Sequence, residues 1–158
     1  MQGPVTGEQI EAARFLAETS NQKWYPLLRG AAEKNVRISS YPAYAAELGG
    51  DKMIPVLIVL AKSPDLEFTS GNAIMAMGST GSRAAIPILL DYLNNPNVNI
   101  SDRANYALQL LTHRNAVPNP QNRDRQTESI KWSQWWKREG AIARIYNDKE
   151  FGEMVPLT

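Results

Sequence analysis

The sequence predicts an all-α fold in which about four antiparallel helix pairs stack into an α-α superhelix. The first observation is a spacing: Pro26, Pro55 and Pro87 each open an apolar helical segment and lie 29 and 32 residues apart. The second is a recurring order, in which a helix of small residues ends in Leu-Gly or Met-Gly and a polar turn leads into Ile-Pro-x-Leu. A repeat period of about 30 residues is typical of stacked helical arrays.

The predicted helices form a single domain over residues 1–158. A divergent first pair is expected at residues 6–34, and the later pairs are expected at 39–63, 66–95 and 100–144. Apolar residues recur in these segments at the three- and four-residue intervals of an amphipathic helix. The expected core stripes of the second, third and fourth pairs are Ile54, Leu57, Ile58 and Ala61; Ala73, Ile74, Met77, Ile86, Leu89, Leu90 and Leu93; and Ala104, Ala107, Leu108 and Leu111.

Local signals predict where these helices begin and end. Gly49 and Gly50 suit the left-handed backbone that closes a helix, because glycine carries no Cβ. Asp51 is expected to cap the helix that follows, and either Ser101 or Asn99 is expected to cap the seventh helix.

The regular pattern ends after the seventh helix. Residues 113–127 contain two prolines, three asparagines and no apolar periodicity, so we expect a long surface loop. A final helix is expected at 128–144, and residues 147–158 are expected to pack loosely or fray. This final helix should carry Trp132, Trp135, Trp136 and Ile142.

Composition excludes several classes of protein. The 158 residues carry a formal net charge of +1, 43% hydrophobic residues and no cysteine. Disulfides and thiolate chemistry are therefore excluded, and no apolar run approaches the ~20 residues that span a bilayer. We expect no membrane insertion. The first residues lack the features of a signal peptide, which is compatible equally with a cytoplasmic protein and with a mature exported form.

The residues quoted above resemble HEAT repeats, and most closely the bacterial PBS-lyase HEAT-like type. The resemblance is carried by Ala46–Asp51 with Ile54-Pro55-x-Leu57, by Ala76-Met77-Gly78 with Ala85-Ile86-Pro87-x-Leu89, by Asn105–Thr112 and by Trp132-x-x-Trp135-Trp136. The resemblance implies a right-handed solenoid whose second helices line a concave face. It also implies a scaffold that binds proteins, and no lyase-specific residue supports a chromophore role.

Catalytic and metal-binding patterns are missing from the sequence. His113 is the single histidine, and with no cysteine it has no partner for a zinc site or for a nucleophilic pair. It is expected at a loop or helix end. We therefore predict a protein that is not an enzyme, with no catalytic residue, no metal and no cofactor.

The alignment of the repeats predicts which residues face a partner. If the core stripes point inward, the concave side should carry a mixed apolar, aromatic and charged set suited to a protein or peptide partner. A monomer is expected. The predicted binding residues are Arg29, Lys52, Val56, Val59, Arg83, Ile88, Asp91 and Tyr92.

A second candidate surface lies in the C-terminal segment. Residues 114–144 hold seven basic and three acidic residues, a local charge of +4. Solvated charge on a loop and helix is one interpretation, and contact with nucleic acid, including a DNA-repair-like activity, is the alternative. Likewise the tryptophans either cover the open end of the array or form an exposed aromatic platform. The residues of this possible surface are Arg114, Arg123, Arg125, Trp132 and Trp136.

Overall fold

The computed structural model describes residues 49–62, 67–117, 121, 123–147, 149–150 and 152–157. The predicted first helix pair and Arg29 lie outside these residues. The described part is built almost wholly of helix, which confirms the all-α prediction. Its elements are the 3-10 helix η2 (Gly50–Met53), α4 (Ile54–Ala61), α5 (Glu67–Ser79), α6 (Ala85–Tyr92), α7 (Val98–Thr112), β1 (Arg114–Asn115), α8 (Arg125–Glu139) and β2 (Val155–Pro156).

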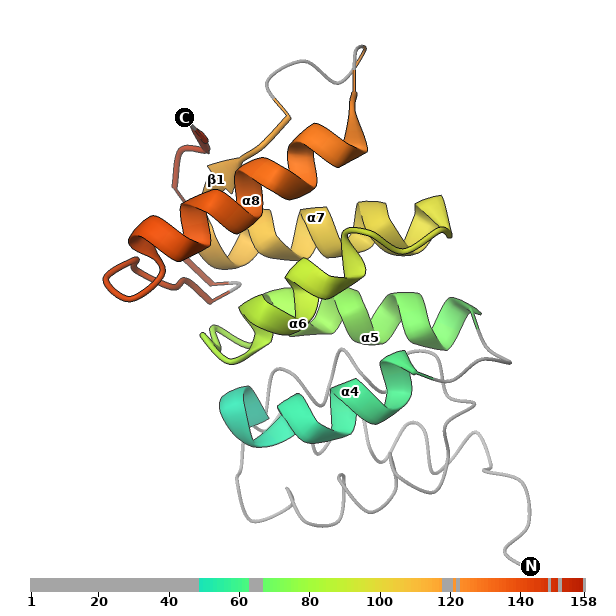
Figure 1. Cartoon of the computed structure of the whole chain (residues 1–158). Helices are drawn as coiled ribbons and strands as arrows, with labels where there is room; N and C mark the ends of the chain where they lie inside the picture. The colour runs from blue at the N-terminus through green and yellow to red at the C-terminus, as the bar shows by residue number, and fades with distance from the viewer. Residues whose placement is uncertain are drawn as a thin grey trace, which may run out of the picture.

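The helices lie in two layers (Figure 1). Helices α4, α6 and α8 face the viewer, and α5 and α7 lie behind them. Helix α5 packs against both α4 and α7, and α6 packs against α7. Consecutive helices therefore alternate between the layers, as stacked helix pairs require.

Proline positions explain where the front helices begin. Pro55 lies in the first turn of α4, where a missing N–H leaves no helical hydrogen bond unmade. Pro87, 32 residues later, also lies in the first turn of its helix, as the third residue of α6. Ile54, Val56 and Ile86 beside these prolines are buried and belong to one hydrophobic core that runs through the described helices. Its fully buried members include Leu57, Ile74, Met77, Ile86, Leu89, Ala104, Ala107, Leu108 and Leu111.

The two rear helices approach each other closely at a glycine. A Cβ placed on Gly78 would lie 2.7 Å from the Cα of Ala107, so the backbones of α5 and α7 meet where neither residue has a large side chain. The sequence predicts a helix that ends at Gly78, but α5 continues to Ser79. Gly50 is left-handed (φ +48°) as predicted, Gly49 is not, and the left-handed residue after α5 is Gly81 (φ +64°).

A buried serine joins each front helix to the next rear helix. Ser70 in α5 donates a hydrogen bond to the Ala61 carbonyl at the end of α4, with an oxygen–oxygen distance of 2.6 Å. Ser101 in α7 donates in the same way to the Leu93 carbonyl after α6, at 2.7 Å. Each bond satisfies a carbonyl that the end of a helix would leave without a partner.

Two of the predicted helix caps are wrong. The side chain of Asn97, not of Ser101 or Asn99, caps α7 and accepts from the Asn99 amide at 3.0 Å. Asp51 makes no capping hydrogen bond and instead accepts from the Ser82 hydroxyl, which joins the turns of two neighbouring repeats.

The C-terminal region is more ordered than predicted. Helix α8 begins at Arg125, because the Asp124 side chain accepts from the amides of Gln126 and Thr127, and it ends at Glu139. The predicted span of 128–144 is therefore displaced toward the N-terminus. Ile142, predicted to lie on this helix, lies beyond its end and is 86% exposed.

The tail does not fray. Strand β2 pairs in parallel with β1, and the amides of Val155 and Leu157 donate to the carbonyls of His113 and Asn115 at 2.9 and 2.8 Å. Leu157 is buried in the core. Pro156 between them faces the free edge of β2 and has no N–H to offer there. The predicted loop at 113–127 thus contains a strand, and its Ala116 and Val117 are buried.

Candidate binding surfaces

The front helices expose one narrow stripe at equivalent positions of two repeats. In and before α4 the stripe consists of Lys52, Pro55, Val59 and Lys62, and in and around α6 it consists of Ala84, Pro87, Asp91 and Asn94. Val59 is 56% exposed, a high value for an aliphatic side chain on a packed helix. We call these eight residues the front stripe.

Three of the predicted binding residues belong to the front stripe, and the other predicted residues do not. Lys52, Val59 and Asp91 are exposed as predicted, whereas Ile88 and Tyr92 are half-buried and pack against the core. Burial, and secondarily the charge of Asp91, raises the pKa of the Tyr92 hydroxyl. Tyr92 therefore stays neutral and is only partly available to a partner.

Val56 is a correction to the predicted set. Its side chain is 2% exposed, because Val56 and Leu60 of α4, together with Met53 at the end of η2, form a second buried stripe beside the expected one. Helix α4 therefore buries more of its circumference than the single face that the prediction assumed.

Arg83 serves the fold instead of lying free on the front face. It donates from Nη1 to the Gly140 carbonyl and from Nη2 to the Ala143 carbonyl. Its guanidinium carbon also lies 5.7 Å from the ring centre of Trp136. The turn before α6 thereby holds the residues that follow the C-terminal end of α8.

The arginines at the start of α8 are paired within the chain. Arg123 binds Glu128 through two hydrogen bonds of 2.9 and 2.7 Å, and it contacts Asp102 at 2.9 Å. The hydrogen bonds with Glu128 are the largest cause that raises the pKa of Arg123, and they outweigh the opposing effect of burial. Arg125 also contacts Asp102, at 3.3 Å.

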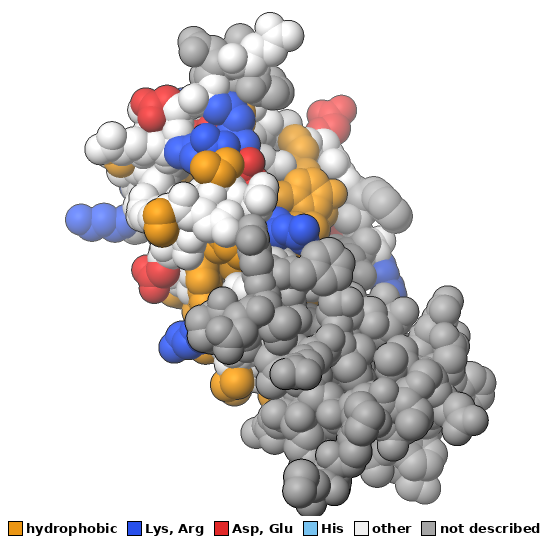
Figure 2. Space-filling model, turned by 90° about the vertical axis from the view of Figure 1, so that its right-hand side faces the viewer, with side chains coloured by type: hydrophobic (Ala, Val, Ile, Leu, Met, Phe, Trp, Pro, Cys, Tyr) orange, Lys and Arg blue, Asp and Glu red, His pale blue; other side chains and the backbone are white. Residues whose placement is uncertain are grey.

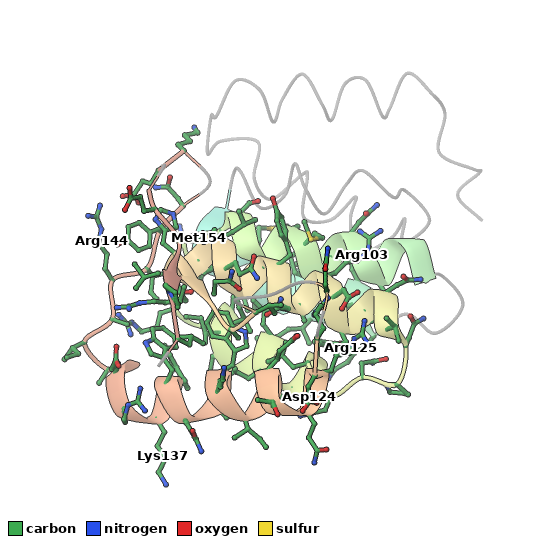
Figure 3. The ribbon with its side chains drawn as sticks, turned by 90° about the horizontal axis from the view of Figure 1, so that it is seen from above. Arg103, Asp124, Arg125, Lys137, Arg144 and Met154 are labelled. Atoms are coloured by element: carbon green, nitrogen blue, oxygen red, sulfur yellow. The ribbon has the colours of Figure 1, made fainter. Side chains whose placement is uncertain are left out.

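This pairing reduces the basic surface that the sequence suggests. Figure 2 shows basic side chains gathered in a small cluster with an acidic side chain beside them. At the other end of α8, Arg114 lies 3.9 Å from Glu139, and Arg144 pairs with Glu150. Lys137 points away from the body of the protein (Figure 3).

The tryptophans of α8 are mainly structural. Trp132 is fully buried and donates from Nε1 to the Asn105 amide oxygen on α7 at 2.7 Å. Trp135 is 2% exposed, and its indole meets Trp132 edge-on. Trp136 is half-buried and lies beneath Arg83. Trp132 is therefore no part of an exposed aromatic surface.

A hollow that the sequence did not predict lies at the C-terminal end of the described array. It has a volume of about 480 Å³ and is bordered by the end of α7, the second half of α8 and the tail. Arg144 and Met154 mark this end in Figure 3, opposite Asp124 and Arg125. We call it the C-terminal hollow; its lining includes His113, Arg114, Trp135, Glu139, Tyr146 and Val155.

Aromatic stacking shapes one wall of the C-terminal hollow. His113 ends α7 in the left-handed conformation (φ 51°), a helix-end position that agrees with its predicted place. Its ring stacks on Tyr146, with 3.8 Å between ring centres, and the Arg144 guanidinium lies 4.7 Å from the Tyr146 ring centre. The Tyr146 amide in turn donates to the Leu111 carbonyl at 2.8 Å. No sequence pattern joins these residues, because they come from two segments that are about 30 residues apart.

The described residues contain no group of three or more His, Asp or Glu side chains placed to hold a metal ion. Within the same residues, no helix combines the length and the apolar character that crossing a bilayer demands.

Comparison with known proteins supports the architecture. Searches of curated proteins and of solved structures gave no significant match. The family model described as HEAT repeats matches residues 21–109, which is more than half of the chain. That model covers HEAT repeats in general, so the narrower resemblance to the bacterial PBS-lyase type stays a prediction. The chain belongs to the HEAT-repeat family.

Proposed function

We propose that this protein is a non-enzymatic, monomeric scaffold that binds a protein or peptide segment along its front stripe. HEAT repeats commonly act as protein-interaction scaffolds, and the chain belongs to that family. The observation that carries the proposal is the front stripe itself, which repeats at equivalent positions of α4 and α6.

The chemistry of the stripe suits a polypeptide. Pro55, Val59 and Pro87 offer apolar contact, and Lys52 and Asp91 offer charges of both signs. Neither charged group has a hydrogen-bond or ion-pair partner recorded among the described residues. Apolar contacts flanked by charges resemble the core and rim of a protein interface.

The alternative proposal is binding of nucleic acid by the basic C-terminal segment. It has less support, because Arg123 and Arg125 are neutralised by Asp102 and Glu128 and the formal net charge is +1. A phosphate-binding surface needs cations free to release counterions. Among the described residues, Lys131 and Lys137 have no recorded acidic partner.

Site-specific photocrosslinking tests the front stripe. In two separate variants, a photoreactive phenylalanine replaces Val59 or Asp91. In the control variant it replaces Lys137, which is exposed on α8. We expect cell lysate to give the same crosslinked polypeptide from positions 59 and 91 and not from 137. The crosslinked segment is then identified and synthesised.

Affinity for that segment completes the test. The variants Val59→Ser and Asp91→Asn are preferred to changes at Tyr92, because both side chains are exposed and neither supports the core. Each should weaken binding by about 1 kcal/mol or more if it lies at the centre of the contact. Unchanged affinity in both variants would contradict the proposal. Recovery of duplex DNA that dissociates between 50 and 200 mM salt would favour the nucleic-acid alternative.

A further inference from the structure

The tail of this protein occupies a site that has the features of a peptide-binding groove. Strand β1 follows α7 directly and presents the carbonyls of His113 and Asn115, which accept from Val155 and Leu157. Main-chain hydrogen bonds to a sheet edge, combined with pockets for alternate side chains, are the mode by which many domains bind extended peptides.

Side-chain alternation fits this mode. Successive side chains of a strand point to opposite faces. Leu157 is 6% exposed and belongs to the core, and Val155, two residues earlier, lines the C-terminal hollow. Met154, between Gly152 and Val155 in the ordered tail, is 44% exposed. Leu157 therefore enters the protein, whereas Val155, on the same face of the strand, borders the C-terminal hollow and stays exposed.

The fit at Val155 is incomplete. Val155 is 45% exposed although it lines a hollow of about 480 Å³. Trp135 and the His113–Tyr146 stack border the same space. A flat aromatic side chain at this position would contact more of that wall than valine does.

A third feature restricts what can bind. A Cβ on Gly152 would lie 2.6 Å from Nδ1 of His113, so the residue three places before Val155 must be glycine or the His113 ring must move. The chemistry of the site thus demands an extended segment with glycine, then a hollow-facing side chain, then a leucine-sized side chain.

The tail is held by few contacts. For residues 152–157 the described structure records two main-chain hydrogen bonds to β1 and one deeply buried side chain. No side chain of these six residues forms a recorded hydrogen bond or ion pair. Such an occupant can be replaced by a segment that makes the same contacts and fills the C-terminal hollow better.

We propose that β1 and the C-terminal hollow form a second binding site, distinct from the front stripe, for an extended segment of a partner protein with the pattern Gly-x-x-aromatic-x-Leu. The residues 152–157 of the chain fill this site in the absence of the partner. Their release would expose the pocket of Leu157 and one wall of the hollow.

The test uses the full chain and a fluorescent peptide of sequence EFGEMVPLT with blocked ends. The variant Leu157→Asp weakens the tail's own docking, and Met154→Asp is its matched control, since it adds the same charge at an exposed position. We expect the peptide to bind Leu157→Asp about tenfold tighter than Met154→Asp or the unmodified chain, because it no longer competes with a tethered segment. Circular dichroism verifies that each variant is folded, and Leu157→Ala replaces Leu157→Asp if the latter is not.

Two further peptides decide the specificity. Replacing the peptide's valine with phenylalanine should tighten binding, and replacing its leucine with aspartate should abolish it. Equal affinity of the peptide for Leu157→Asp and Met154→Asp would overturn the proposal, as would weaker binding of the phenylalanine peptide. A concentration-dependent dimer that disappears in Leu157→Asp would identify the tail of a second copy as the occupant and would also overturn it. None of these results depends on the front stripe, so the two sites fail or succeed separately.

Discussion

At the scale of single residues, Asp124 shows how one side chain can fix where a helix begins. Its carboxylate accepts from the amides of Gln126 and Thr127 and from the Thr127 hydroxyl, at 3.1, 3.4 and 2.5 Å. These bonds, led by that of the Thr127 side chain, lower the pKa of Asp124 below its ordinary value of 3.8. The start of α8 at Arg125 therefore depends on an ionised carboxylate.

The variant Asp124→Asn should remove this pH dependence. A group whose pKa is lowered by folding stabilises the folded state above its unfolded pKa, and this stabilisation is lost as the pH falls through the folded pKa. Asparagine also caps helices but does not ionise in this range. We expect the unfolding midpoint of the unmodified chain to fall more than that of Asp124→Asn between about pH 5 and pH 2. Denaturant titrations at several pH values measure this, and parallel curves would contradict it.

At the scale of elements, the spacing of α5 and α7 is set by a missing side chain. Gly78 costs helix propensity, yet it allows the two backbones to meet at Ala107. Gly71, one heptad earlier on α5, faces a different neighbour: a Cβ there would meet the flexible end of the Arg103 side chain. The two glycines thus differ in what a methyl group would displace.

Alanine substitutions separate these two roles. Gly78→Ala should destabilise the fold by about 1–3 kcal/mol, because the new Cβ must push one backbone from another. Gly71→Ala should change stability by less than about 1 kcal/mol, since Arg103 can move aside and alanine favours the helix. Chemical denaturation of both variants provides the comparison. Equal losses would mean that the close approach at Ala107 is not what requires glycine.

At the scale of the whole molecule, contacts between turns join successive repeats. Ser82 binds Asp51 in the preceding turn, and Arg83 binds the carbonyls of Gly140 and Ala143 beyond α8. These turns lie on the left-hand edge of the array in Figure 1. Helix α8 is therefore held to the rest of the protein by this edge as well as by the burial of Trp132.

Removing Arg83 should loosen α8 selectively. Arg83→Ala loses two charge-assisted hydrogen bonds and the contact with Trp136, and we expect a loss of about 1–2 kcal/mol at this partly exposed position. Arg83→Lys should recover less than half of it, because an ammonium cannot span both carbonyls as a guanidinium does. Hydrogen exchange should accelerate in residues 125–147 and not in α5. Uniform acceleration would contradict a local role.

The repeat pattern predicts most of the described helices but few features of the candidate binding surfaces. Regular signals, such as the spacing of Pro55 and Pro87 and the apolar stripes behind them, predict helices well because each stripe must be buried. The prediction for Val56 was wrong because the apolar periodicity of a helix does not show how much of its surface the fold buries. The β1–β2 pair and the C-terminal hollow were missed because two-residue strands have no period and their partners are distant in sequence.

Pro156 affects the tendency of this protein to aggregate at high concentration. An exposed strand edge with free N–H and C=O groups can template further strands and so start the growth of a fibre. The outward-facing position of β2 is a proline, which has no N–H, and the strand is only two residues long. The outer edge of β2 therefore lacks the N–H that an added strand would need, and on that side the short sheet is a poor template for aggregation.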